Sequence, residues 1–496
     1  MKRLINLSAV AFLSCTAISC SFDGMGDVFY PEIGNSAVED MLEPNPEEGD
    51  RFDEIKDNPF IKTSEQNVST FSIDADGAAY GYMRKMLYLN QLPVASAVRI
   101  EEYLNYFTFN YDDPIEDHSV SINSEVGPCP WNQDHRLIRL GLKGMSMDPD
   151  DIPASNFVFM VDVSGSMNSD DKLDLLKTSL ISLVDNLRPI DRVSIITYAS
   201  KVEKLIGSTP ASEAEKIKDA ISKLNARGST AGGAAMKMAY EEALANYIEG
   251  GNNRVIMGTD GDFNVGVTSN DALVEMVQTY ADQGIYLTVC GFGTGNLNDS
   301  MMESISNEGN GTYEYIDSEL EMTKVFVNEK SKFYSVANDT KVQITFDPEK
   351  VESYRLIGYE NRVMSNEDFE NDKKDAGEIG AGQTITALYE IVPVADSEED
   401  QQIAVFDVRY KKALGSESIL ITENVLDLKK PATNQEELSF AAGVAAFGMI
   451  LRDSKYKGSA NFDMAYELAT EGLDYDPYGY RSEFLELIQI AKKLSK

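Results

Sequence analysis

The feature that most constrains the fold is a stretch, residues 156–335, in which apolar strand-like runs alternate with amphipathic helical segments. The runs are NFVFMVDVS, RVSIITYAS, NRVIMGTD, IYLTVCGFG and GTYEYI, and helical patterns such as KLDLLKTSLISLVDNL lie between them. Continuously apolar strands that alternate with helices indicate a parallel sheet covered on both faces. The sequence therefore predicts a doubly wound α/β domain over residues 156–335.

The helical segments of this stretch carry two further signals. Ser212 with Glu215, and Ser318 with Glu321, have the spacing of a capping box at a helix start. The first helix has an apolar stripe at helical spacing. That stripe consists of Leu173, Leu176, Leu180, Leu183 and Leu187.

The rest of the chain changes pattern on either side of this domain. Residues 66–118 have helical periodicity, and residues 119–145 alternate like strands. Together they predict an N-terminal domain, 66–155. Alternating runs in 338–430 predict a β-sandwich that strands from 119–145 complete. The pattern of the last block, 435–496, predicts helices. We thus expect an α/β domain with a flanking β-sandwich and helical N- and C-terminal segments.

The N-terminus has the pattern of a secretory signal. Residues 1–20 combine two basic residues, a short apolar run and small residues before Cys20. The apolar run is too short to cross a bilayer. The pattern resembles a bacterial lipoprotein signal in which Cys20 is lipidated, with Cys15 or a cleaved signal without lipid as alternatives. Residues 21–65, acidic and rich in Pro, Gly and Asn, predict a flexible tether.

The charge balance restricts the partners. Acidic residues outnumber basic ones by 82 to 44, which gives a net charge of −38. Such a charge repels nucleic acid and anionic membrane surfaces. It suits a solvated surface or the binding of cations and basic partners. We expect no nucleic-acid partner.

The segment VDVSGSM leaves the first predicted strand where ligands of doubly wound sheets bind. Its residues Asp162, Ser164 and Ser166 are spaced by two and share one side of an extended segment. Asp260 follows another strand, and Thr230 lies on a glycine-flanked loop before a helix. At strand and loop ends, Asp162 and Thr230 are expected to face solvent. Two carboxylates and three hydroxyls predict a hard-cation site for Mg²⁺, with Mn²⁺ or Ca²⁺ as alternatives.

This set resembles the Rossmann-like von Willebrand factor type A (vWA) domain and its metal-ion-dependent adhesion site. The pattern of that site is Asp-x-Ser-x-Ser with a distant Thr and Asp. Other segments, among them STFSIDADGAAY, CPWNQDHRLIRLGLKG, SFAAGVAAFGMILR and DPYGYRSEF, are similar to the bacterial family of vWA-domain lipoproteins. The resemblance covers nearly all of residues 66–496. It implies a metal completed by an acidic side chain of a protein ligand.

The sequence contains few of the residues and motifs that enzymatic catalysis requires. The chain has two histidines, His118 and His135, and both lie outside the predicted α/β domain. Neither a GxSxG elbow nor an HExxH motif is present. We therefore expect a binding protein and not an enzyme.

The combined features predict a Mg²⁺-dependent protein-binding module, lipid-anchored in the cell envelope, with the outer membrane as its site. The periplasmic face and the cell surface are alternative positions for the anchored protein. The alternative is an envelope assembly or chaperone-like factor that uses the same metal site. A metal-dependent hydrolase is a third reading, which the small number of histidines disfavours.

Overall fold

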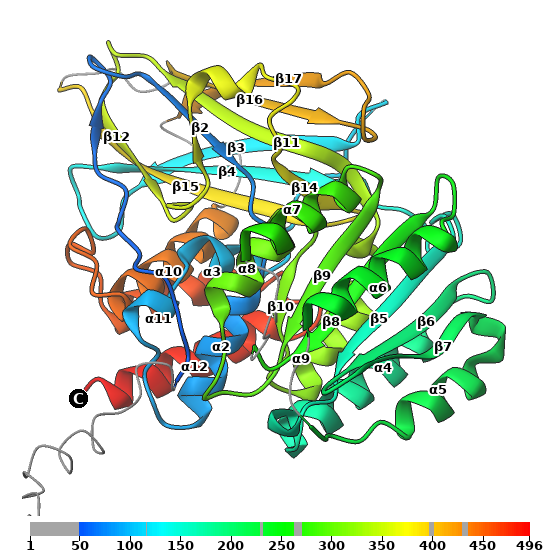
Figure 1. The fold of residues 1–496 in the computed structure, drawn as a ribbon. Coiled ribbons are helices and arrows are strands. Elements are labelled where there is room, and N and C mark those ends of the chain that lie inside the picture. The colour runs from blue at the N-terminus through cyan, green and yellow to red at the C-terminus, as the bar shows by residue number, and fades with distance from the viewer. Residues whose placement is uncertain (1–48, 116, 229–231, 262–269, 396–400, 429–434) are drawn as a thin grey trace, which may run out of the picture. The chain divides into compact units, whose positions relative to one another are not determined.

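A computed structural model describes residues 49–115, 117–228, 232–261, 270–395, 401–428 and 435–496 (Figure 1). The predicted signal sequence, with Cys15 and Cys20, and residues 21–48 of the predicted tether lie outside the described residues. Residues 49–65 differ from the expected flexible tether. Asp50 accepts hydrogen bonds from the backbone N–H groups of Gly295 and Leu297, and strand β1 (Ile61–Lys62) pairs with β12. These polar contacts hold the segment against the folded chain.

The predicted doubly wound α/β fold is confirmed. Its sheet has the strand order β10-β9-β8-β5-β6-β7, and all pairs are parallel except β6 with β7 (Figure 1). The strands are β5 (Ser155–Asp162), β6 (Arg192–Tyr198), β7 (Val202–Pro210), β8 (Asn252–Thr259), β9 (Ile285–Gly291) and β10 (Tyr313–Tyr315). The edge strand β7 was not predicted, because most of its residues are at least partly exposed and it lacks a continuous apolar run.

Helices bury both faces of this sheet. On β5, Val158 and Met160 belong to one hydrophobic cluster, whereas Phe157, Phe159 and Val161 belong to another. The first cluster includes residues of α6 (Gly232–Ala245), α7 (Asn270–Ala281) and α8 (Asp299–Asn307). The second includes α4 (Leu175–Asp185) and α5 (Ala214–Ser222). The predicted leucine stripe packs in this cluster, although Leu173 lies before α4 and the partly buried Leu187 lies after it. Because successive side chains of a strand point to opposite faces, the apolar run of β5 serves both layers.

The two capping predictions have different outcomes. Ser318 caps α9 (Glu319–Thr323), and its hydroxyl accepts a hydrogen bond from the Glu321 N–H at 3.3 Å. The prediction for Ser212 is wrong. That residue lies inside a 3₁₀ turn, Ala211–Glu213, and α5 begins only after this turn, without a side-chain cap.

Two antiparallel sheets form the β-sandwich and share one hydrophobic core. One sheet has the order β1-β12-β15-β4-β3, and the other has β13-β2-β11-β16-β17, with β14 also paired to β11. Its strands are β2 (Val68–Ser72), β3 (Val120–Pro128), β4 (Arg136–Gly144), β11 (Ser335–Phe346), β12 (Val351–Ile357), β13 (Val363–Met364), β14 (Gly377–Gly380), β15 (Thr384–Pro393), β16 (Gln401–Lys411) and β17 (Ile419–Asp427). The predicted strands of 119–145 are β3 and β4, whereas β2 lies in a stretch predicted to be helical.

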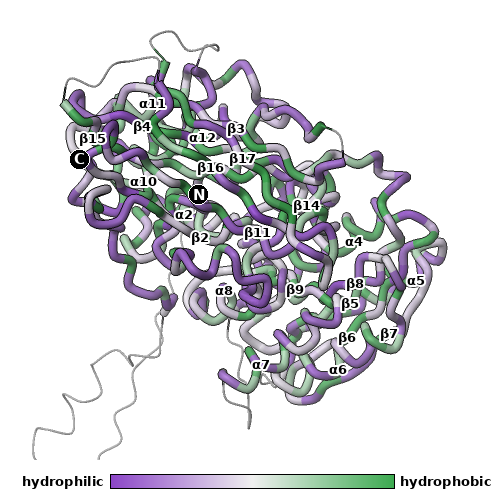
Figure 2. Tube along the Cα trace, turned by 90° about the horizontal axis from the view of Figure 1, so that it is seen from above, coloured by the Kyte–Doolittle hydropathy of each residue, from purple (hydrophilic) through white to green (hydrophobic). Residues whose placement is uncertain are grey.

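Helices from both ends of the described chain share a third hydrophobic cluster. They are α2 (Ala78–Tyr88), α3 (Ile100–Asn105), α10 (Glu436–Leu451), α11 (Phe462–Glu471) and α12 (Tyr480–Leu494). Most residues of α10 are buried. In Figure 2, hydrophobic stretches of the chain are green and hydrophilic stretches are purple. No helix within the described residues is long and apolar enough to span a bilayer.

Candidate metal centre

The site lies where two neighbouring parallel strands end. Strand β5 ends at Asp162, and β8 ends at Thr259, directly before Asp260. The pairing of Val161 with Gly258 places the next residues of both strands at the same edge of the sheet. The side chains of Asp162 and Asp260 are both fully buried. The structure thus brings the two predicted carboxylates to one edge, but Asp162 does not face solvent as expected.

Hydrogen bonds orient the Asp162 carboxylate and the two predicted serines. The Ser164 N–H donates to Asp162 Oδ1 at 2.8 Å, and Thr259 Oγ1 donates to Oδ2 at 3.3 Å. The hydroxyl oxygens of Ser164 and Ser166 lie 2.9 Å apart. Three side chains of the VDVSGSM segment are therefore close together. Thr259 is a partner that the sequence analysis missed, since nothing distinguishes it from an ordinary strand threonine.

Burial raises the pKa of Asp162 to about 6. Hydrogen bonds from Ser164 oppose this increase, while the negative charge of Asp260 adds to it. Burial and the charge of Asp260 both disfavour the ionised form of Asp162. A cation placed between the two carboxylates would therefore be stabilised. With only hydroxyl and carboxylate oxygens as donors, the residues fit a hard divalent cation.

Thr230, the fifth predicted ligand, lies outside the described residues. The chain just before it runs along the serine segment, because the Gly165 N–H donates to the Gly228 carbonyl at 2.9 Å. Gly228 has a φ of +80°, and a Cβ there would collide with the Ser200 hydroxyl. Gly165 does not adopt positive φ. A Cβ at Gly165 would lie 3.3 Å from the Gly228 carbonyl oxygen, so close approach of the two loops favours glycine there.

Lys172 is a further residue of the site that the sequence analysis missed. Its ammonium lies 2.9 Å from Asp260 Oδ2 and 3.0 Å from Asn296 Oδ1. A single π-helical turn, Asp170–Asp174, carries this lysine toward the strand ends. Such turns occur often at functional sites. In the sequence Lys172 is only one charge within an acidic run, so no local signal could have identified it.

Known family models match three parts of this chain. Residues 156–328 match the model of the von Willebrand factor type A domain, and residues 46–139 match a model described as von Willebrand factor. Residues 331–494 match the model described as "Uncharacterized protein YfbK, C-terminal".

The comparisons also found individual proteins that are similar to this chain. YfbK of Escherichia coli is 37% identical over 470 residues, which cover 89% of this chain and 81% of YfbK. Protein sll0103 of Synechocystis is 27% identical over 204 residues, or 41% of this chain and 47% of that protein. A solved vWA structure from Catenulispora acidiphila has 15% identity and a TM-score of 0.43, and the match covers 76% of this chain and 91% of that one.

The fold and the matched models define a vWA-domain protein. The extent of the similarity to YfbK goes further: the chain belongs to the YfbK family of vWA-domain proteins. Its vWA domain indicates a protein-interaction module.

Proposed function

We propose that this protein is a Mg²⁺-dependent protein-binding module. Asp162, Ser164, Ser166 and Asp260 would hold the ion, with Thr230 as the fifth ligand. The observation that carries the proposal is the meeting of two fully buried carboxylates at adjacent strand ends, beside two serine hydroxyls 2.9 Å apart. Mn²⁺ and Ca²⁺ have the same preference for oxygen donors.

The bound ion would supply an electrophilic centre for an acidic side chain of the partner protein. The chain's own residues set the conditions for this. The Ser164 N–H and Thr259 hydroxyl fix the Asp162 carboxylate, and Lys172 partly neutralises Asp260. Few formal charges on the ion's protein ligands leave it attractive to a further carboxylate. A partner acid, not a reaction, would complete the site.

The anchor and the domain limits belong to the same proposal. Residues 1–20 would be a lipoprotein signal, with Cys20 as the lipidated residue, and the protein would act in the cell envelope. The proposed domains are 66–155, 156–335, 338–430 and 435–496. Support for the anchor comes from the N-terminal sequence pattern alone.

Partner capture tests this function. The full chain is immobilised and exposed to envelope extract with Mg²⁺ or with EDTA, and bound proteins are identified and then purified. We expect at least one purified partner to bind directly only with Mg²⁺, and to lose binding to Asp162→Asn but not to the exposed control Asp174→Asn. Binding that is equal in Mg²⁺ and EDTA would contradict the proposal. Rapidly exchanging capture of many unfolded clients would favour the assembly-factor alternative.

A further inference from the structure

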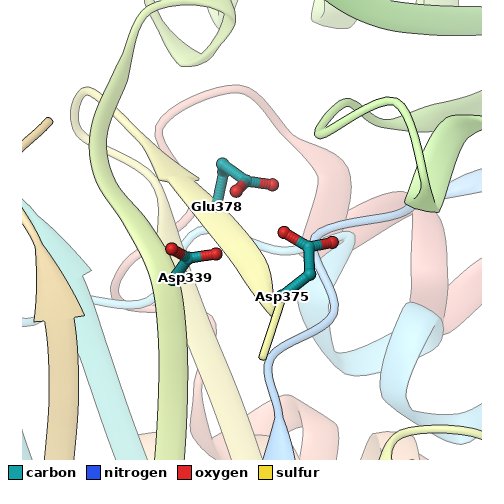
Figure 3. Close-up of side chains that lie close together, drawn as sticks. All are labelled: Asp339, Asp375 and Glu378. Carbon is teal, nitrogen blue, oxygen red and sulfur yellow. The ribbon is translucent and has the colours of Figure 1, made fainter. Parts of the chain in front are cut away.

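A second group of acidic side chains lies outside the vWA domain, on the β-sandwich. Asp339 belongs to β11, Glu378 belongs to β14, and Asp375 precedes β14. Each residue offers one carboxylate oxygen, and these three oxygens all lie within 4.8 Å of one another. Figure 3 shows the three carboxylates turned toward a common space. No sequence motif links them, since Asp339 is 36 residues before Asp375.

An irregularity in strand pairing brings the three residues together. Ala337 pairs with Ile379 and Thr340 with Gly377, so the register of β11 on β14 shifts between these pairs. Asp339 lies within the shift and has a φ of +49°. An extra residue in one strand bends it and redirects a side chain. Here the bulge places Asp339 beside the acids that flank the start of β14.

The charges of the cluster are incompletely balanced. Lys411 lies 2.6 Å from Asp339 Oδ2, but Oε1 of Glu378 is shielded from solvent and has no hydrogen-bond partner among the described residues. Buried carboxylate oxygens nearly always have a partner. The unpartnered atom therefore points to a missing cation.

We propose that Asp339, Asp375 and Glu378 bind a Ca²⁺ ion, independently of the vWA site. Ca²⁺ takes six to eight oxygen ligands at about 2.4 Å, so two oxygens that share one ion can be at most about 4.8 Å apart. All three carboxylate oxygens meet this limit. Mg²⁺ requires about 2.1 Å and near-octahedral geometry, which an irregular site of this kind suits less well. Water would complete the coordination on the exposed Asp375 side.

The ion would tie the approach to β14 onto the bulge of β11. Residues 370–375 are exposed, and Lys411 and Lys341 hold this stretch by donating to the backbone carbonyls of Asp372 and Asn371. A cation bound by Asp339, Asp375 and Glu378 would add a stronger link at the same place. We therefore expect Ca²⁺ to protect this segment from proteolysis.

Calorimetric titration of the full chain with Ca²⁺ tests the proposal. The titration uses the Asp162→Ala variant, which lacks the proposed vWA metal site. Any Ca²⁺ binding measured in this variant therefore comes from another site. We expect one Ca²⁺ to bind in this background, and Glu378→Gln or Asp375→Asn to weaken that binding at least tenfold. The matched control is Asp368→Asn, a partly buried acid of the same region that lies outside the cluster and accepts a hydrogen bond from the Ser365 hydroxyl.

Circular dichroism and melting temperature establish that each variant folds. Both amide substitutions remove repulsion, so we expect metal-free melting temperatures at or above that of the parent. Ca²⁺ should also slow cleavage within residues 370–375 in the parent but not in Glu378→Gln. Absence of Ca²⁺ binding by the folded Asp162→Ala protein at millimolar Ca²⁺ would overturn the proposal, as would unchanged binding in both amide variants.

Discussion

The ammonium of Lys172 lies 2.9 Å from Asp260 Oδ2, so a carboxylate that we assign to a metal ion already carries an internal cation. Only 11% of the lysine side chain is exposed, and Asp260 is fully buried. A buried ion pair that loses one partner leaves the other charge uncompensated. The lysine therefore keeps the strand ends stable without metal, and an incoming ion must share Asp260 with it.

Replacing Lys172 should have opposite effects on stability and on metal binding. In Lys172→Met we expect a loss of about 3–5 kcal/mol of metal-free stability, because a buried carboxylate loses its ion pair. The affinity for Mg²⁺ should rise, since the ion no longer competes with an ammonium. Urea unfolding and calorimetry measure the two quantities, with Lys177→Met as the control, since its partner Asp174 is exposed. Weaker Mg²⁺ binding would show that Lys172 positions Asp260 and does not compete.

Asp162→Ala should lower the stability of the metal-free protein, although the sequence analysis expected Asp162 to face solvent. The side chain is buried and accepts hydrogen bonds from the Ser164 N–H and the Thr259 hydroxyl. Its loss leaves these donors without their partner, at a cost of about 1–3 kcal/mol. We expect a lower metal-free melting temperature for Asp162→Ala and a smaller decrease for Asp162→Asn, which keeps an acceptor oxygen. Equal melting temperatures for all three proteins would contradict the hydrogen bonding described here.

Arg84 joins three parts of the chain through buried ion pairs. From α2 it contacts Asp317 at 2.5 Å, Glu321 at 2.6 Å and Glu483 of α12 at 3.1 Å. Arg84→Leu should cost about 3–5 kcal/mol, because it removes the arginine that pairs with two buried carboxylates. Lys223→Leu, which breaks an exposed pair with Asp219, should cost less than about 1 kcal/mol. Urea unfolding compares the two, and equal costs would refute the structural role of Arg84.

Glu101 should make the protein less stable as the pH rises. Burial, with the nearby Glu360 charge, raises the pKa of Glu101 from 4.5 to about 8, and its Oε2 has no hydrogen-bond partner among the described residues. The folded state therefore binds a proton that the unfolded state releases above pH 4.5. The contribution of Glu101 to the free energy of unfolding is fully present below pH 4.5 and is lost as the pH rises to about 8.

The variant Glu101→Gln isolates this effect. We expect its unfolding free energy to fall less between pH 5 and pH 8 than that of the parent, by an amount on the order of a few kcal/mol. Urea unfolding at several pH values measures the difference, with the exposed Glu349→Gln as the control. Parallel curves for parent and Glu101→Gln would show that another group carries the pH dependence.

Local patterns predicted those parts of the fold in which burial follows the chain. The run of β5 is apolar because both its faces are covered, and Ser318 caps a helix through its immediate neighbours. The edge strand β7 escaped prediction because its side chains are largely exposed. Carboxylates at two strand ends were predictable, since parallel strands bring their carboxyl ends together.

Contacts that depend on tertiary placement could not be predicted. Lys172 reaches Asp260 only because a π-helical turn carries it there, although the two are 88 residues apart. The cluster of Asp339, Asp375 and Glu378 depends on a register shift between β11 and β14. A bulge leaves no periodic signal in a sequence, so neither its position nor the neighbours it creates can be read from the chain.

The most direct test of the central claim is a calorimetric Mg²⁺ titration of the full chain in the Glu378→Gln background, which removes the second proposed site. We predict a single Mg²⁺ bound per chain, and at least a tenfold loss of affinity on adding Ser166→Ala, whose hydroxyl lies 2.9 Å from that of Ser164. Absence of saturable binding of Mg²⁺, Mn²⁺ or Ca²⁺ at millimolar concentration, or binding unaffected by Ser166→Ala, would contradict the assignment of the metal site.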